Sequence, residues 1–148
     1  MLSRVRALLA ALWAGELLTV ALLAAPNAFA ALERAQAGLY VGRLFEMDAR
    51  VALAAGLLLV MMERRLQQGG KTSGSVMGWN LVLPLLALFL TVLGYYGLQP
   101  LMAAARNGQG SWTFLQLHAV SLALFGLRMM AVLVLAWRVM PKSAVPQA

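Results

Sequence analysis

The sequence contains no cysteine, and this absence removes several kinds of chemistry at once. The chain can form no disulfide, no thiolate metal site and no cysteine nucleophile. Histidine occurs once, at His118, whereas zinc and copper sites normally need three or four ligands. No glycine-rich phosphate loop, Ser/His/Asp order or H-E-x-x-H motif is present. The sequence therefore favours a protein that is not an enzyme, and we expect no bound cofactor.

Charge is also scarce: only 11% of the residues are charged, with 5 acids against 12 bases, while 62% are hydrophobic. Globular domains are about 45–50% apolar. A soluble domain of 148 residues could not bury so much hydrocarbon, so the lipid bilayer is the expected surrounding. The net charge of +7 does not indicate nucleic-acid binding, because the bases lie beside the ends of apolar segments rather than along one face.

Four apolar stretches are long enough to cross a membrane. They cover about residues 7–25, 38–62, 79–101 and 112–138, and Pro26 is expected to end or kink the first. A polar loop over Glu63–Ser75 and a turn at Asn107–Gly110 connect the later stretches. The sequence predicts an all-α, integral membrane four-helix bundle that forms a single domain over residues 1–148.

The distribution of basic residues predicts the orientation of this bundle. With the N-terminus inside, seven bases lie on the inner side: Arg4, Arg6, Arg64, Arg65, Lys71, Arg138 and Lys142. Only Arg34 and Arg106 then lie on the outer side. This positive-inside bias predicts a multi-pass protein with both termini in the cytoplasm. The alternative is a signal peptide cleaved near Ala28-Phe29-Ala30, which the long apolar run and Glu16 disfavour.

Six ionisable side chains interrupt the apolar stretches: Glu16, Arg43, Glu46, Asp48, Arg50 and Arg128. A charge at mid-bilayer costs roughly 2.5–3.5 kcal/mol unless it is paired or hydrated. We therefore expect a buried polar network, to which His118 and Ser121 also belong. Helical rise places Glu16 and Arg128 both about 14 Å above the inner boundary, so they could pair.

On the second stretch, Arg43, Glu46 and Arg50 share one helical face, and Asp48 points to another. Asp48 is expected to find a partner on the first or third stretch. Either the network only fixes which helix packs where, or it lines a cavity that handles a proton, an ion or a small polar ligand. A third interpretation places Arg43 and Glu46 at the membrane interface.

His118 allows a second kind of function. As an axial ligand it would suit a haem- or copper-handling redox protein, with basic side chains facing propionates. The alternative is a hydrogen-bonded histidine between helices. The small-residue spacings Gly38-x-x-x-Gly42 and Ala11-x-x-x-Gly15 suit close helix contacts within the chain, or contacts with another copy or a membrane partner.

A weak internal repeat occurs at an offset of 72 residues. Leu18-Thr19-Val20 recurs as Leu90-Thr91-Val92, Arg34 as Arg106, and Gly38 as Gly110. Such a repeat would give two helical hairpins in the same orientation, related by an axis along the membrane normal.

Seven short motifs follow one another along nearly the whole chain. They are Leu12-Trp13-Ala14-Gly15, Ala25-Pro26 through Phe29, Ala37-Gly38 through Glu46, Glu63-Arg64-Arg65, Leu98 through Met102, Leu117-His118-x-x-Ser121 and Ala136-Trp137-Arg138. In order and spacing the chain resembles the bacterial transmembrane protein 205-like family. The resemblance implies a four-helix protein of the bacterial inner (plasma) membrane that keeps its first span. It implies no established activity and no catalytic residue.

Overall fold

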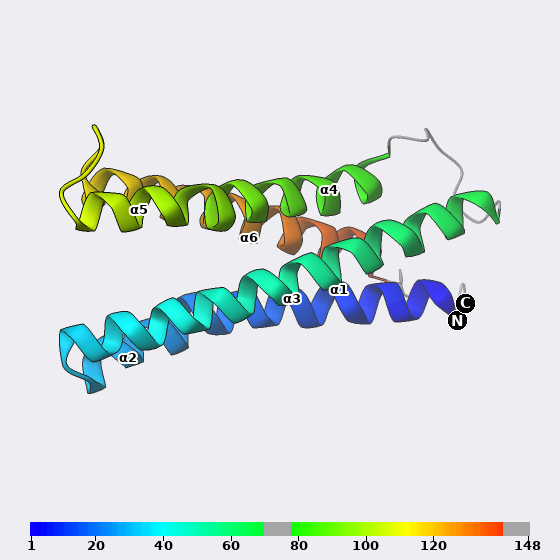
Figure 1. Cartoon of the computed structure of the whole chain (residues 1–148). Coiled ribbons are helices and arrows are strands. Elements are labelled where there is room, and N and C mark those ends of the chain that lie inside the picture. Colours follow the sequence, from blue (N-terminus) through cyan, green and yellow to red (C-terminus); the bar gives the residue numbers. More distant parts are fainter. Residues whose placement is uncertain (70–77, 141–148) are drawn as a thin grey trace.

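The computed structural model describes residues 1–69 and 78–140, which form helices and turns but no strand. The helical elements are α1 (Leu2–Thr19), η1 (Val20–Ala24), α2 (Ala25–Ala31), α3 (Arg34–Gln68), α4 (Trp79–Thr91), η2 (Val92–Gly97), α5 (Leu98–Arg106) and α6 (Phe114–Val139). The two η segments are π-helical turns that join the helices on either side. The described chain therefore forms four long helical rods, the all-α bundle that the sequence predicts (Figure 1).

Three of these rods are long and apolar enough to cross a membrane: Leu2–Ala31, Trp79–Arg106 and Phe114–Val139. The chain is thus a helical membrane protein. The fourth rod, α3, is not among them, because ionisable side chains lie on both sides of its charge-free stretch, residues 51–62. With 35 residues, α3 is roughly 52 Å long, well beyond the ~30 Å of a hydrocarbon core.

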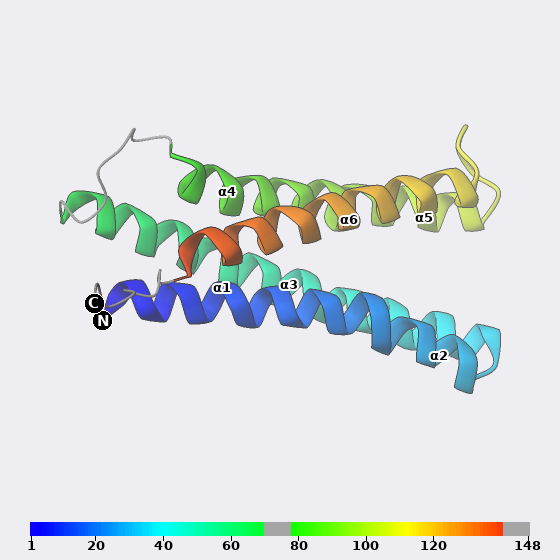
Figure 2. The same cartoon turned by 180° about the vertical axis from the view of Figure 1, so that it is seen from behind.

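The four rods are arranged as a square in which α1 and α4 occupy opposite corners. α1 packs against α3 and α6, and α4 packs against the same two helices. Figures 1 and 2 show the resulting two hairpins, α1–η1–α2 with α3 and α4–η2–α5 with α6. We call the end of the bundle where α1 begins the terminal end. The opposite end, where residues 32–33 and 107–113 connect the rods, is the turn end.

Of the two outcomes expected for Pro26, an end of the first rod or a kink in it, the first does not occur, since the helix continues to Ala31. The π-helical turn explains why: the Ala25 N–H donates to Val20 O, five residues back, so the hydrogen-bond ladder shifts just before the proline. Pro26 then lies in the first turn of α2, where its missing N–H costs little.

The expected loop over Glu63–Ser75 begins later in the structure, because α3 remains helical through Gln68. Glu63 is almost fully buried and forms an ion pair with Arg6 of α1. This pair and the buried Leu66 hold the last turns of α3 against the bundle. Residues 70–75 of the expected loop lie outside the described residues, as do the bases Lys71 and Lys142.

The two hairpins repeat one local design. Thr19 and Thr91 each donate a hydroxyl hydrogen bond of 2.8 Å to the carbonyl four residues back, and each directly precedes a π-helical turn. The 72-residue repeat therefore has a structural counterpart at Leu18–Val20 and Leu90–Val92. It has none at Arg34 and Arg106, because Arg34 begins α3 whereas Arg106 ends α5. The longer connection before α6 changes the offset to 80 for the second helix of each hairpin.

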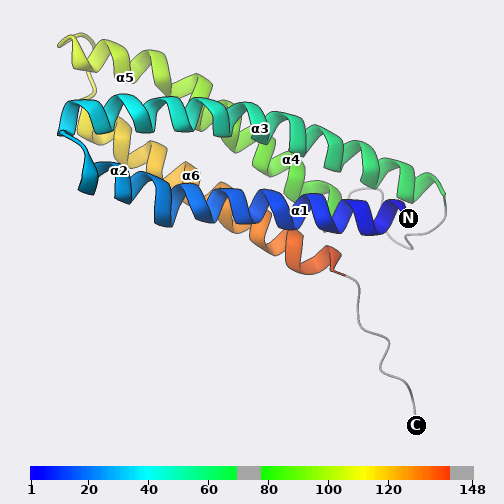
Figure 3. The same cartoon turned by 90° about the horizontal axis from the view of Figure 1, so that it is seen from below.

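The core that joins the two hairpins lies in the terminal half of the bundle. The main core joins all four rods through small and aliphatic side chains: Ala7, Ala10, Trp13, Ala14, Leu17, Ala52, Ala55, Leu59, Leu83, Ala87, Ala131, Val132, Leu135, Ala136 and Val139. Towards the turn end the two hairpins diverge (Figure 1), and the view from below in Figure 3 shows one hairpin in front of the other. A separate small cluster there, Leu98, Met102 and Leu117, belongs to the second hairpin alone.

Gly56 marks the closest approach of α3 to α4 and gives a test of this core. A Cβ at this position would lie 2.7 Å from Cγ and Cδ2 of Leu88. We expect Gly56→Ala to cost about 1–3 kcal/mol through overpacking, lowering the thermal unfolding midpoint in detergent followed by circular dichroism. Gly126→Ala is the matched control, because its Cβ would meet nothing within 4 Å. Equal midpoints for the two variants would contradict the close approach.

Candidate functional site: a four-helix charge cluster and its cavity

One polar side chain from each rod meets at the centre of the bundle. Arg128 of α6 donates to Asp48 Oδ2 of α3 over 2.5 Å and to Thr91 Oγ1 of α4 over 3.2 Å. The ion pair is buried, with side-chain exposures of 4% for Arg128 and 3% for Asp48. The Glu16 carboxyl of α1 lies near the Asp48 carboxyl. We call these four residues the charge cluster.

The charge cluster contains two acids and one base. With Arg128 charged, the cluster is neutral as a whole when Glu16 and Asp48 together carry one proton. The face of the Phe125 ring also lies 4.9 Å from the Arg128 guanidinium carbon, a cation–π contact. Even so, three buried atoms find no hydrogen-bond partner among the described residues: Glu16 Oε2, Asp48 Oδ1 and Arg128 Nε. The cluster thus retains hydrogen-bonding capacity that a proton, water or ligand could use.

A cavity of about 690 Å³ extends from the charge cluster to the turn end. It lies between the two hairpins, and Arg128 and Thr91 line it together with side chains of α2, α3, η2, α5 and α6. Its lining contains three arginines (Arg34, Arg106 and Arg128) and one histidine, but no acidic residue. The charge cluster therefore separates a closely packed terminal half from a hollow, electropositive turn half.

His118 and Ser121, both expected in the polar network, line this cavity rather than the charge cluster itself. The His118 ring stacks on Phe114, with centroids 5.7 Å apart and an interplanar angle of 10°. The Arg106 guanidinium carbon lies 4.7 Å from the centroid of the same Phe114 ring. No group of three or more histidine, aspartate or glutamate side chains that could hold a metal ion occurs within residues 1–69 and 78–140.

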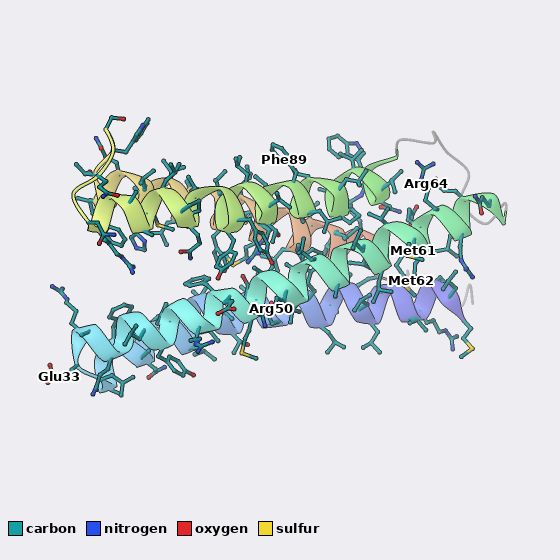
Figure 4. The ribbon with its side chains drawn as sticks, viewed as in Figure 1. Glu33, Arg50, Met61, Met62, Arg64 and Phe89 are labelled. Carbon is teal, nitrogen blue, oxygen red and sulfur yellow. The ribbon has the colours of Figure 1, made fainter. Side chains whose placement is uncertain are left out.

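Arg43, Glu46 and Arg50 lie apart from the charge cluster. Glu46 forms ion pairs with Arg50 at 2.5 Å and with Arg43 at 3.7 Å, as their shared helical face predicts. This face points outward, since the side chains of Arg43 and Arg50 are 83% and 69% exposed. Figure 4 shows Arg50 midway along the visible surface of α3, between Glu33 at the turn end and Arg64 near the terminal end. These three residues are thus not part of the interior network.

The partner of Arg128 differs from the expected one. α1 and α6 are neighbours, and Glu16 and Arg128 share one level of the bundle, but the ion pair of Arg128 is with Asp48. The helix starts in the structure explain this pair: Asp48 and Arg128 each lie 14 residues after the first residue of their helix, Arg34 and Phe114. Three further residues were missed, namely Thr91 of the cluster and the cavity arginines Arg34 and Arg106.

Comparison with known proteins identifies the family. Residues 8–111 match the domain of unknown function DUF4149. The chain belongs to this family. The match contains Glu16, Asp48 and Thr91 of the charge cluster, whereas α6 with Arg128 and His118 follows it. No curated protein and no solved structure matches the chain. The DUF4149 protein is therefore a membrane protein whose activity has to be inferred from its own residues.

The buried ion pair gives a stability prediction. Asp48→Asn removes the carboxylate that is paired with the buried Arg128 guanidinium, and breaking a buried pair in this way costs about 3–5 kcal/mol. We expect a marked fall in the thermal unfolding midpoint in detergent, and substantial recovery in Asp48→Leu/Arg128→Leu, where neither charge remains.

Glu46→Gln is the control on the same helix. It removes a carboxylate from an exposed ion pair, which contributes about 0–1 kcal/mol. Midpoints that fall equally in Asp48→Asn and Glu46→Gln would show that the Arg128 pair does not hold the bundle together.

Proposed function

We propose that this DUF4149 protein is a single-domain, multi-pass protein of the bacterial inner membrane, related to the transmembrane protein 205-like family, in which α3 is the fourth span. The positions of the bases support an orientation with both termini in the cytoplasm. Arg4, Arg6, Arg64, Arg65 and Arg138 lie at the terminal end of the bundle, and Arg34 and Arg106 lie at the turn end. In the proposed orientation the cavity mouth lies on the outer side.

We further propose that the protein binds a small polar or charged ligand in the cavity and is not an enzyme. The observation that carries this proposal is the double role of Arg128, which lines the cavity and is also fixed in the charge cluster by Asp48 and Thr91. A buried network that served only helix packing would not need an open, electropositive cavity beside it. In this proposal the network does both, since it joins the hairpins and forms the inner wall of the polar path.

The lack of native cysteine allows a direct test of the cavity. Ser121→Cys introduces one thiol on the cavity lining, and Arg65→Cys introduces one at the terminal end. In intact cells, a small membrane-impermeant thiol reagent should label Ser121→Cys and leave Arg65→Cys unlabelled.

Gly42→Leu should then suppress labelling of Ser121→Cys. Gly42 lines the cavity and has nothing within 4 Å of a built Cβ, so leucine fills space without a clash. Gly15→Leu is the control, because Gly15 also has open surroundings but lies outside the cavity. Labelling of Arg65→Cys alone would overturn the proposed orientation. Absence of Ser121→Cys labelling both in intact cells and in delipidated protein would overturn the accessible cavity.

A second candidate function is haem binding at His118. It is favoured by the placement of His118 in the same cavity as Arg34 and Arg106, whose guanidinium groups could face propionates. A haem would supply redox or electron-transfer chemistry when bound, and this chain would contribute the imidazole ligand and the cationic surroundings.

The visible absorption spectrum separates the two candidates. Haem ligation by His118 requires an intense Soret band in the purified protein that His118→Ala shifts or removes. The ligand-binding proposal expects no such band, before or after addition of haemin. A Soret band that depends on His118 would establish the second candidate instead.

A further inference from the structure

We propose that the cavity binds one anionic phospholipid of the surrounding bilayer, with its phosphate between Arg34 and Arg106 and an acyl chain along the cavity wall. This inference rests on the proposed function, because it names the ligand class of the same cavity. Three features support it: the charge of the mouth, the apolar wall and the lateral opening.

The mouth of the cavity carries two arginines from different hairpins. Arg34 is the first residue of α3, and Arg106 is the last residue of α5. Within residues 1–69 and 78–140 neither forms an ion pair. Glu33, the residue before Arg34, is not part of the cavity lining and lies at the tip of the first hairpin (Figure 4). Two guanidinium groups without a carboxylate are the arrangement that binds a phosphate.

The wall between the mouth and the charge cluster is mainly aromatic and aliphatic. Phe45 of α3 and Phe125 of α6 meet edge to face across the cavity, with centroids 5.3 Å apart. Val41, Leu90 and Leu122 continue this surface. From Arg34 to Phe45 the cavity follows α3 for roughly 16.5 Å, the rise of 11 helical residues. A wall of this length and polarity suits a hydrocarbon chain better than a hydrated ion.

The inner wall of the cavity does not offer a second anion site. Arg128 is already neutralised by Asp48, so the net positive charge is concentrated at the mouth. An anion that occupied the cavity without an apolar part would leave most of the wall uncovered. The ligand is therefore expected to be amphipathic, with its single acidic head at the turn end.

The cavity is also open toward the side of the bundle, where lipid is available. Leu115 and Leu122 belong to its lining and are 75% and 53% exposed. A side opening lined by leucine lets an acyl chain enter from the bilayer while the head group stays at the interface. For this reason we assign the ligand to the membrane rather than to the aqueous phase.

Native mass spectrometry of the full chain in mild detergent tests this assignment. The purified protein is titrated separately with an anionic phospholipid, a zwitterionic phospholipid of equal chain length and a fatty acid. We expect one anionic phospholipid bound per chain, with an affinity at least about tenfold higher than for the zwitterionic lipid. Equal binding of the two phospholipids, or preferential binding of the fatty acid, would overturn the phospholipid assignment.

Two variants and two controls locate the bound lipid. Arg34→Gln/Arg106→Gln should weaken binding by about tenfold or more per arginine, and Gly42→Leu should abolish it by filling the cavity. Arg4→Gln/Arg64→Gln removes the same charge from exposed positions at the terminal end, and Gly15→Leu adds the same side chain outside the cavity. Both controls should bind as the unchanged protein does. Equal losses in variants and controls would place the lipid elsewhere.

The failure of this inference can be distinguished from failure of the proposed function. If Ser121→Cys is labelled in a Gly42-dependent manner but no lipid is retained, the cavity stands and the lipid assignment is wrong. If Ser121→Cys stays unlabelled in delipidated protein, the accessible cavity itself is wrong, and the lipid assignment falls with it.

Discussion

A guanidinium inside a bilayer needs a counter-ion within reach, and this requirement determines how the four rods are placed. Asp48 and Arg128 lie on α3 and α6, which occupy diagonal corners of the square. Their side chains meet only if the bundle centre is free of bulky residues at that level and both hairpins keep one register. Thr91 and Glu16 complete the contact from the other two corners. One polar contact therefore specifies which helices are neighbours and in which register they pack. Contacts between alanine and leucine side chains alone would allow several such arrangements.

The same contact divides the protein into two unlike halves. On its terminal side, alanines such as Ala10, Ala52 and Ala87 are fully buried and let the helices approach closely. On its turn side, the glycines of α3 face open space and the hairpins diverge. The π-helical turns η1 and η2 occur where this change begins. Each π-helical turn follows a threonine whose hydroxyl donates a hydrogen bond to the carbonyl four residues back, a contact that often bends helices. π-Helical turns themselves are found often at functional sites.

Much of this fold is readable in the sequence, because lipid imposes a simple rule on composition. The charge-free run Leu81–Leu98 predicts a span, and helical rise places Glu16 and Arg128 at one level. The helical rise gives the depth of a residue in the membrane but not the direction in which its side chain points around the helix. It could therefore not decide between Glu16 and Asp48 as the partner of Arg128. Thr91 resembles any other threonine in an apolar run. The helix continues past Glu63 because Glu63 pairs with Arg6, which lies 57 residues earlier in the sequence. A π-helical turn accommodates Pro26, and no local sequence motif predicts that turn.

The shared orientation of the two hairpins has a mechanical consequence. Transporters built from inverted repeats reach inward- and outward-facing states when their halves exchange conformations, because the repeat axis lies in the membrane plane. Here the two hairpins run in the same direction, so the repeat axis lies along the helices. If the hairpins exchanged conformations, the cavity would therefore form again at the same end of the bundle. Rotation of one hairpin against the other about the Asp48–Arg128 pair would widen or narrow the cavity. It would not open a path through the closely packed terminal half. If the proposed cavity binds a ligand, this architecture suits capture and release at one end of the bundle rather than alternating access.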